Sequence, residues 1–179
     1  MRYGQVHSAS NAPRSITLIE TARPLYERAL AMCEKALGPE HPRTAASLNN
    51  LAGLLQDQGD VVGAWPVVER ALAINEKALG PEHPHTATNL NNLAVLLQDQ
   101  GDVVGARPLY ERALAIRERA LGPEHPDTGA SLNNLAGLLR DHGDLAGTRP
   151  LLERALAINE KVLGPEHPDT RHDARCDRQ

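Results

Sequence analysis

Apolar residues recur along this chain with the spacing of an α-helix. In the segment 80–121, four of them share one helix face through i, i+3, i+4 and i+7 spacing: Leu90, Leu93, Ala94 and Leu97. A second apolar stripe with helical spacing runs from Ala106 to Leu121. The segment is therefore predicted to form two consecutive amphipathic helices.

Glycine, proline and aspartate mark the predicted helix ends. Gly101 and Asp102 separate the two helices, because glycine adopts the left-handed conformation after a helix and aspartate caps the next one. Gly122-Pro123 is predicted to end the second helix, since proline cannot continue it. The following helix is expected to begin at Pro126 or Thr128.

One set of prolines falls about six residues inside each second helix, where proline removes a backbone hydrogen bond. These residues are Pro24, Pro66, Pro108 and Pro150. Two interpretations stay open: either the helix is kinked, or it starts later than its apparent cap.

The same pattern repeats every 42 residues. The pentapeptide Gly-Pro-Glu-His-Pro begins at Gly38, Gly80, Gly122 and Gly164. A fixed period of this size is typical of a solenoid of stacked units. The units divide the chain into a half repeat at 18–37, full repeats at 38–79, 80–121 and 122–163, and flanking segments at 1–17 and 164–179. Residues 1–17 are expected to be a disordered tail or a divergent capping helix, and residues 164–179 a truncated repeat and polar tail.

Composition narrows the class of protein. The chain is rich in Leu and Ala and contains no Phe, which argues against a β-sandwich or barrel. Its 19 basic and 23 acidic residues give a net charge of -4, which does not favour a nucleic-acid or anionic-membrane partner. No apolar run is long enough for a membrane span. Two cysteines cannot form a disulfide framework, so we expect a cytoplasmic protein.

Small residues at fixed positions carry a family resemblance. The segments are Leu48-Asn49-Asn50-Leu51-Ala52, Gln58-Gly59-Asp60, Ala64 and Ala71-Leu72. They resemble the tetratricopeptide repeat, and the 42-residue unit resembles the kinesin-light-chain type and its bacterial relatives. The resemblance implies an all-α, right-handed superhelix (α-solenoid) of about seven helices, with first helices on the concave side and second helices on the convex side. It also implies a non-enzymatic scaffold that binds a protein or peptide.

Asparagine pairs in the first helices are the leading candidates for peptide contact. Asn is an unfavourable residue inside a helix, because its side chain competes for backbone hydrogen bonds, so its recurrence there indicates a structural or binding role. By the resemblance, the first Asn of each pair faces the groove and the second lies nearer the helix interface. A carboxamide can bond a peptide backbone without reading its sequence. The alternative is that each Asn bridges adjacent helices. The first residues are Asn49, Asn91 and Asn133, and the second residues are Asn50, Asn92 and Asn134.

A neighbouring groove position holds Gln56, Gln98 and Arg140, and the position after it holds aspartate in every repeat. The aspartate row is interpreted as a solvated turn. Kinesin light chains accept acidic cargo through basic residues, whereas this wall is neutral or acidic except for Arg140. The sequence therefore favours a neutral or basic peptide.

Other chemistry-bearing residues have structural interpretations. The Glu-His pairs, such as Glu82-His83, stand a full repeat apart, so they cannot share one metal ion and are interpreted as turn residues. Cys33 aligns with Asn75, Arg117 and Asn159, a position expected to be exposed. Trp65 is expected to pack. No cofactor is expected, because nearly every polar feature recurs in each repeat and an active site needs a unique convergence.

Two alternative functions remain open at the level of sequence. The half repeat leaves one helix without its partner and the last helix without a clear cap, which would allow self-association through the array ends. Alternatively, the chain is the repeat region of a larger sensor that carries a nucleotide-switch or protease domain.

Overall fold

The protein folds as a succession of antiparallel helices. The computed structural model describes the backbone of residues 12–163 and the side chains of residues 22–161. Within this range lie seven α-helices and no strand: α1 (Ala12–Leu37), α2 (Pro42–Asp57), α3 (Val61–Leu79), α4 (Pro84–Asp99), α5 (Val103–Leu121), α6 (Pro126–Asp141) and α7 (Leu145–Leu163). The all-α prediction is confirmed. Helix α1 starts six residues before the predicted repeat boundary at residue 18, while residues 1–11 and 164–179 lie outside the described range.

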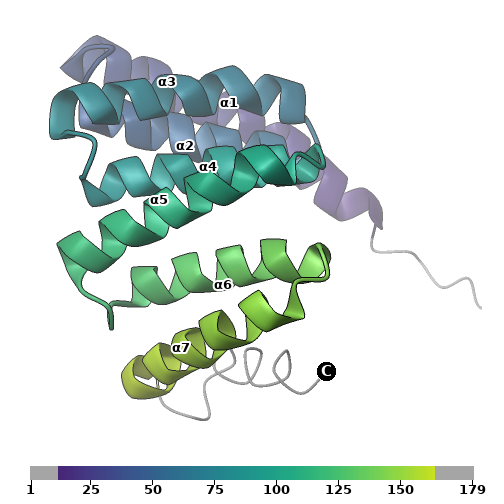
Figure 1. The fold of residues 1–179 in the computed structure, drawn as a ribbon. Helices are drawn as coiled ribbons and strands as arrows, with labels where there is room; N and C mark the ends of the chain where they lie inside the picture. Colours follow the sequence, from purple (N-terminus) through teal and green to yellow (C-terminus); the bar gives the residue numbers. More distant parts are fainter. Residues whose placement is uncertain (1–11, 164–179) are drawn as a thin grey trace, which may run out of the picture.

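Most contacts between helices join consecutive helices of the stack, and α2 also contacts α4. Helices α2 and α3, α4 and α5, and α6 and α7 form the hairpins of the three full repeats. The second helix of each repeat then packs on the first helix of the next, as α3 does on α4 and α5 on α6. Figure 1 shows this succession running from α1 and α3 at one end to α7 at the other. The arrangement is the predicted solenoid.

The Gly-Pro-Glu-His-Pro segment is a helix-capping turn. The Nδ1 atoms of His41, His83 and His125 each accept a hydrogen bond from a backbone N–H two residues later, at 3.1 Å. Thr86 Oγ1 donates to the Gly80 carbonyl at 2.8 Å, and the threonines at 44 and 128 repeat this bond. The histidines therefore serve as helix caps, as the turn interpretation predicted. Among residues 12–163, no cluster of three or more potential metal ligands occurs.

The turn inside each repeat follows the predicted glycine and aspartate signals. Gly101 has φ of 78°, and the Asp102 carboxylate accepts from the Gly105 N–H at 2.9 Å to cap α5. A Cβ atom at position 105 would lie 2.6 Å from Asp102 Oδ2, so the cap requires glycine there. Helix α5 begins directly after Asp102, and Pro108 lies inside it. The interpretation in which the proline delays the helix start is therefore wrong.

The core is built from alanine and leucine with one large aromatic residue. The cluster between the first two full repeats joins α2, α3 and α4 through Ala52, Ala64, Val68 and Leu96. Trp65 packs partly buried against this cluster, as expected. Tyr110, only 2 % exposed, occupies the corresponding core position of α5. Small alanines at the closest helix approaches allow Leu side chains to fill the remaining space.

Some ion pairs connect the second helices of successive repeats, and others join the end of a second helix to the turn that opens its own repeat. Arg112 of α5 contacts Glu76 of α3 at 3.0 Å, and Lys77 contacts Glu40 at 2.6 Å. Equivalent pairs recur in the other repeats and comprise Arg70–Glu34, Arg154–Glu118, Arg119–Glu82 and Lys161–Glu124. Each exposed pair contributes no more than about 1 kcal/mol. The pairs between second helices favour one register of neighbouring repeats, whereas the Lys77–Glu40 pair and its equivalents lie within a repeat.

Replacing Leu90 by alanine tests the dependence of the array on this core. Leu90 is 1 % exposed, so Leu90→Ala is expected to lower the free energy of unfolding by about 2–5 kcal/mol. Val104 is 88 % exposed, and Val104→Ala is the matched control, with an expected change within about 0.5 kcal/mol. Urea unfolding followed by circular dichroism measures both. Equal losses in the two variants would contradict this description of the core.

Candidate functional site

The first asparagine of each pair lies half-buried on the first helices α2, α4 and α6. The Oδ1 atom of Asn49 accepts hydrogen bonds from Nδ2 of Asn89, at 2.7 Å, and from Nδ2 of Asn92, at 3.4 Å. The Oδ1 atom of Asn91 accepts from Nδ2 of Asn134 at 2.8 Å. These carbonyl oxygens bridge adjacent repeats, which is the alternative that the sequence left open. Asn133 occupies the corresponding place on α6, where it is half-buried as well.

Half of each bridging carboxamide is still available to a ligand. Among the described residues, the NH2 groups of Asn49 and Asn91 donate no hydrogen bond. The second asparagines reach back toward the preceding repeat, as Asn92 and Asn134 do. Asn50 is exposed instead, because within residues 12–163 no first helix precedes α1.

The neighbouring groove position forms a polar cluster between α4, α5 and α6. Gln98 accepts a hydrogen bond from the Tyr110 hydroxyl at 3.0 Å and donates to Asp141 at 3.1 Å. Arg140 donates to Asp141 at 3.4 Å. Burial raises the pKa of the Tyr110 phenol, and the nearby Asp99 carboxylate raises it further. Gln56, the corresponding residue of the first full repeat, is half-buried opposite the smaller Val68, and its Nε2 atom is buried without a partner.

A buried polar position in the second helices is the main feature that sequence reasoning missed. The residues expected at an exposed position are buried at Asn75 (2 % exposed) and Arg117 (8 % exposed), so that expectation is wrong. Asn75 Nδ2 donates to Asn89 Oδ1 at 2.6 Å, and Arg117 donates to the Ser131 hydroxyl at 2.7 Å. Cys33, at the equivalent position of α1, also bonds to a residue of the following first helix, since its Sγ atom accepts from the Ser47 hydroxyl at 3.2 Å.

Helical spacing contained a signal for this position. Asn75 continues the buried stripe of Ala64, Val68 and Ala71, and its bonding partner follows 14 residues later in the next first helix. Arg117 and its partner Ser131 are likewise separated by 14 residues. A polar residue on an apolar stripe requires a buried partner, because an unpaired polar group in a core is costly.

Arg117 is a buried cation that contacts neutral groups. Besides Ser131, it donates to the Asp127 carbonyl at 3.0 Å and to the Thr88 hydroxyl at 3.2 Å. Burial lowers the pKa of its guanidinium, and the Asp127 carboxylate opposes that shift. Its Nε atom is buried without a partner. This side chain therefore ties α4, α5 and α6 together through their polar atoms.

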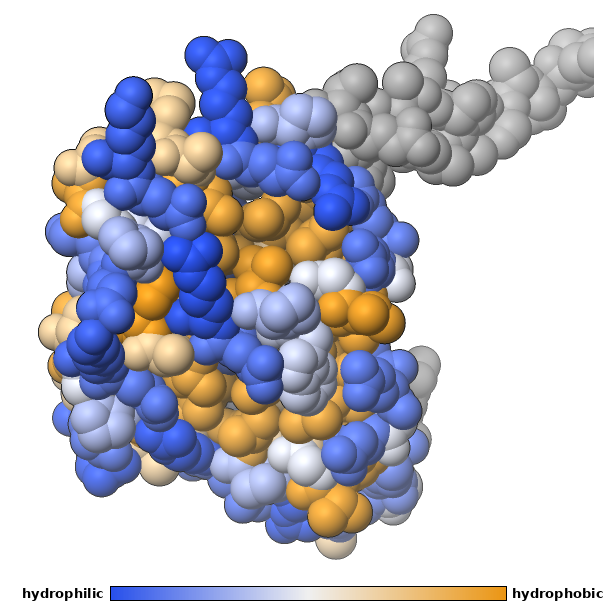
Figure 2. Space-filling model, turned by 90° about the horizontal axis from the view of Figure 1, so that it is seen from above, coloured by the Kyte–Doolittle hydropathy of each residue, from blue (hydrophilic) through white to orange (hydrophobic). Residues whose placement is uncertain are grey.

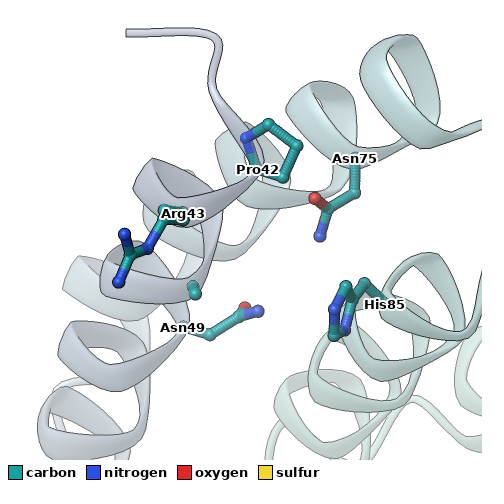
Figure 3. A pocket seen from close by; sticks show the side chains of 6 residues that line it. Pro42, Arg43, Asn49, Asn75 and His85 are labelled. Atoms are coloured by element: carbon teal, nitrogen blue, oxygen red, sulfur yellow. The ribbon is translucent and has the colours of Figure 1, made fainter. Parts of the chain in front are cut away.

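A hollow lies at the corresponding junction of α2, α3 and α4. It measures about 140 Å³ and is lined by Pro42, Arg43, Ala46, Asn49, Asn75 and His85. Figure 3 shows Asn75 pointing from α3 into the space between Pro42 and His85, with the tip of Asn49 directed toward His85. The hollow therefore joins the asparagine row of the first helices to the buried polar position of the second helices.

Two family models match this repeating arrangement. Both are described as tetratricopeptide repeat; one matches residues 18–64 and 87–147, and the other matches residues 44–85 and 128–169. The chain belongs to the tetratricopeptide repeat family. The predicted resemblance is thus confirmed over the helical array.

Solved structures place this tetratricopeptide repeat protein near kinesin-light-chain-like arrays. It is 34 % identical to a kinesin-light-chain-like protein with nearly identical repeats from Podosopora anserina, covering 89 % of this chain and 75 % of that one, with a TM-score of 0.70. It is 26 % identical to BtubC (BKLC) from P. vanneervenii, covering 92 % of this chain and 65 % of that one, with a TM-score of 0.78. No curated protein matches the chain in sequence. None of the helices of this tetratricopeptide array between residues 12 and 163 is long and apolar enough to span a bilayer.

Substitution of Asn89 tests the polar connection between repeats. Asn89 is fully buried and joins Asn75 to Asn49, so Asn89→Ala is expected to cost about 1–3 kcal/mol by leaving Asn75 Nδ2 unpaired and Asn49 Oδ1 with only its longer bond from Asn92. Asn50→Ala is the matched control, because Asn50 is exposed and has no bond within residues 12–163. Thermal and urea unfolding of both variants provide the measurement. A loss for Asn89→Ala no larger than that of its control would show that the bridge adds nothing to stability.

Proposed function

We propose that this tetratricopeptide repeat protein is a non-enzymatic scaffold that binds a peptide along the first helices α2, α4 and α6. The observation that supports this proposal is the pair of unused NH2 groups on Asn49 and Asn91, which sit half-exposed one repeat apart. An NH2 group donates hydrogen bonds to the carbonyl oxygens of a peptide backbone. Asn133 continues the row on α6.

The bridging bonds prepare the asparagines for this role. Because the Oδ1 atoms of Asn49 and Asn91 are held by the next repeat, their NH2 groups are fixed in orientation before a peptide arrives. Preorganised donors lose less conformational entropy on binding. Neighbouring first helices stand about 10 Å apart, which corresponds to about three residues of an extended peptide. One backbone carbonyl in every three would meet a carboxamide.

The charged residues on the first helices, beside the asparagine row, favour a neutral or basic peptide. Arg140 pairs with Asp141, and Gln98 contacts that same carboxylate, so the positive charge is offset within the protein. Tetratricopeptide repeats serve as interaction scaffolds, and the recurrence of nearly every polar feature from repeat to repeat supports binding over catalysis.

Replacing the two NH2 groups by oxygen tests this proposal. Asn49→Asp and Asn91→Asp keep the bridging oxygen and remove the donor. Peptides selected from a random display library on the wild-type array should bind each variant about five- to tenfold more weakly, as expected for one lost hydrogen bond. Isothermal titration calorimetry measures the affinities. Gln100→Glu, at an exposed turn, introduces the same charge and should leave binding unchanged.

Two results would contradict peptide binding along the asparagine row. One is that no peptide is enriched on the folded wild-type array. The other is that the aspartate variants bind the selected peptides as tightly as the Gln100→Glu control, with circular dichroism showing all proteins folded.

A second candidate function is self-association through α1, and it has its own supporting observation. Leu25 and Met32 of α1 are 65 % and 63 % exposed, whereas Ile74, the counterpart of Met32 on α3, is 6 % exposed. Figure 2, which looks onto the end of the molecule that carries α1 and α3, shows apolar surface between hydrophilic side chains. Exposed apolar faces of this kind mark contact sites.

Polar substitutions on α1 test the self-association candidate. If the wild-type protein associates, the double variant Leu25→Gln with Met32→Gln should lower its average mass, because less apolar area is buried between copies. Light scattering across a range of concentrations measures the mass. Val62→Gln with Val104→Gln removes two even more exposed apolar side chains elsewhere and is the control. A wild-type protein that stays monomeric at the highest concentration would contradict this candidate.

A further inference from the structure

The hollow between α2, α3 and α4 results from a difference between two repeats. At the next junction, Arg117 stands where Asn75 stands here, and its guanidinium bonds to Thr88 and to the Asp127 carbonyl. Those two residues lie 42 positions after Ala46 and His85, which both line the hollow. The long side chain of Arg117 therefore extends into the place that the shorter Asn75 leaves open.

One hydrogen-bond acceptor and one hydrogen-bond donor that make no bond among the described residues border this hollow. Asn75 is 2 % exposed, and its Oδ1 atom is buried without a hydrogen-bond donor. Within the described part of the chain, Asn49 Nδ2 donates no bond, although Asn49 lines the same space. Figure 3 shows the Asn75 amide directed into the hollow, where an entering N–H group would approach Oδ1. An occupant that offers one donor and one acceptor would satisfy both groups.

The remaining wall residues restrict the charge of the occupant. Arg43 and His85 line the hollow, and its lining contains no carboxylate, which disfavours a lysine or arginine side chain. A carboxylate occupant carries no donor for Asn75 Oδ1, and it would place its own charge beside that oxygen. An aliphatic occupant would contact Pro42 and Ala46 but leave both polar groups unpaired.

We infer that this hollow is a subsite for a carboxamide side chain, that of Asn or Gln, presented by a bound peptide. The carboxamide C=O accepts from Asn49 Nδ2, and its NH2 group donates to Asn75 Oδ1. As a peptide subsite the inference rests on the proposed function, since the hollow lies beside the asparagine row. It adds sequence selectivity at one repeat to a groove that otherwise contacts only the peptide backbone.

Propionamide, the side chain of glutamine without a backbone, is the probe for this subsite. In two-dimensional NMR of the isotope-labelled protein, the side-chain amide signals of Asn49 and Asn75 are expected to shift saturably at about millimolar to tens of millimolar propionamide, as befits so small a ligand. Propionate and butane-1-amine serve as the charged probes and should bind about tenfold more weakly or not at all. Because propionamide is not a peptide, this test can succeed where peptide binding fails, and the reverse is equally distinguishable.

Copying one junction onto the other provides matched variants. The four substitutions Ala46→Thr, Asn75→Arg, His85→Asp and Asn89→Ser introduce the counterparts of Arg117 and of the residues that it contacts, so the protein should stay folded while the Asn49 signal no longer responds to propionamide. The reciprocal set, Thr88→Ala, Arg117→Asn, Asp127→His and Ser131→Asn, should open a second hollow and make the Asn91 signal respond.

Three results would overturn the inference. The first is no shift at up to about 100 mM propionamide, which would mean that the hollow holds water only. The second is equal binding of propionamide and propionate. The third is an unchanged response of Asn49 in the folded variant that carries Asn75→Arg and its three companion substitutions.

Discussion

The second helices α3 and α5 are each covered by two first helices, one from their own repeat and one from the next. Helix α3 illustrates the constraint, because Ala64 and Val68 share a core with Ala52 of α2 and Leu96 of α4. No single hairpin can bury both faces of its second helix, so a repeat is stable only in a stack. The alanines at the closest approaches and the capped turns follow from this need to stack helices at a constant spacing.

The same constraint creates a place for polar side chains inside the stack. Where a second helix enters between two first helices, one position reaches polar groups of the following repeat. Asn75 and Arg117 fill it with side chains of different length but bond at the same separation of 14 residues. Polar pairs of this kind add register to an otherwise uniform apolar interface, since a shifted helix would leave a buried group unpaired. Their variation between repeats is also what distinguishes one junction from another.

The asparagine row combines a structural role with the proposed binding role in one side chain. A carboxamide has both an acceptor and a donor, so the oxygens of Asn49 and Asn91 accept bonds from the next repeat while their nitrogens donate none among the described residues. The stack itself thus orients the proposed binding groups. This explains why asparagine recurs at a helix position that its intrinsic propensity disfavours.

The sequence by itself determined the elements and their order, because those depend on local physics. The spacing of Leu90, Leu93 and Leu97 fixes a helix face, and Gly101 with Asp102 fixes a turn, whatever surrounds them. Only the tertiary structure decided which polar residues are buried. Asn75 and Arg117 read as surface residues in a window of sequence, yet each meets its partners on the following helix, and Arg117 reaches the preceding one as well. Helical spacing places Asn75 on the stripe of Ala64, Val68 and Ala71, but the partners that a polar residue meets there come from another repeat, so a local pattern does not contain them.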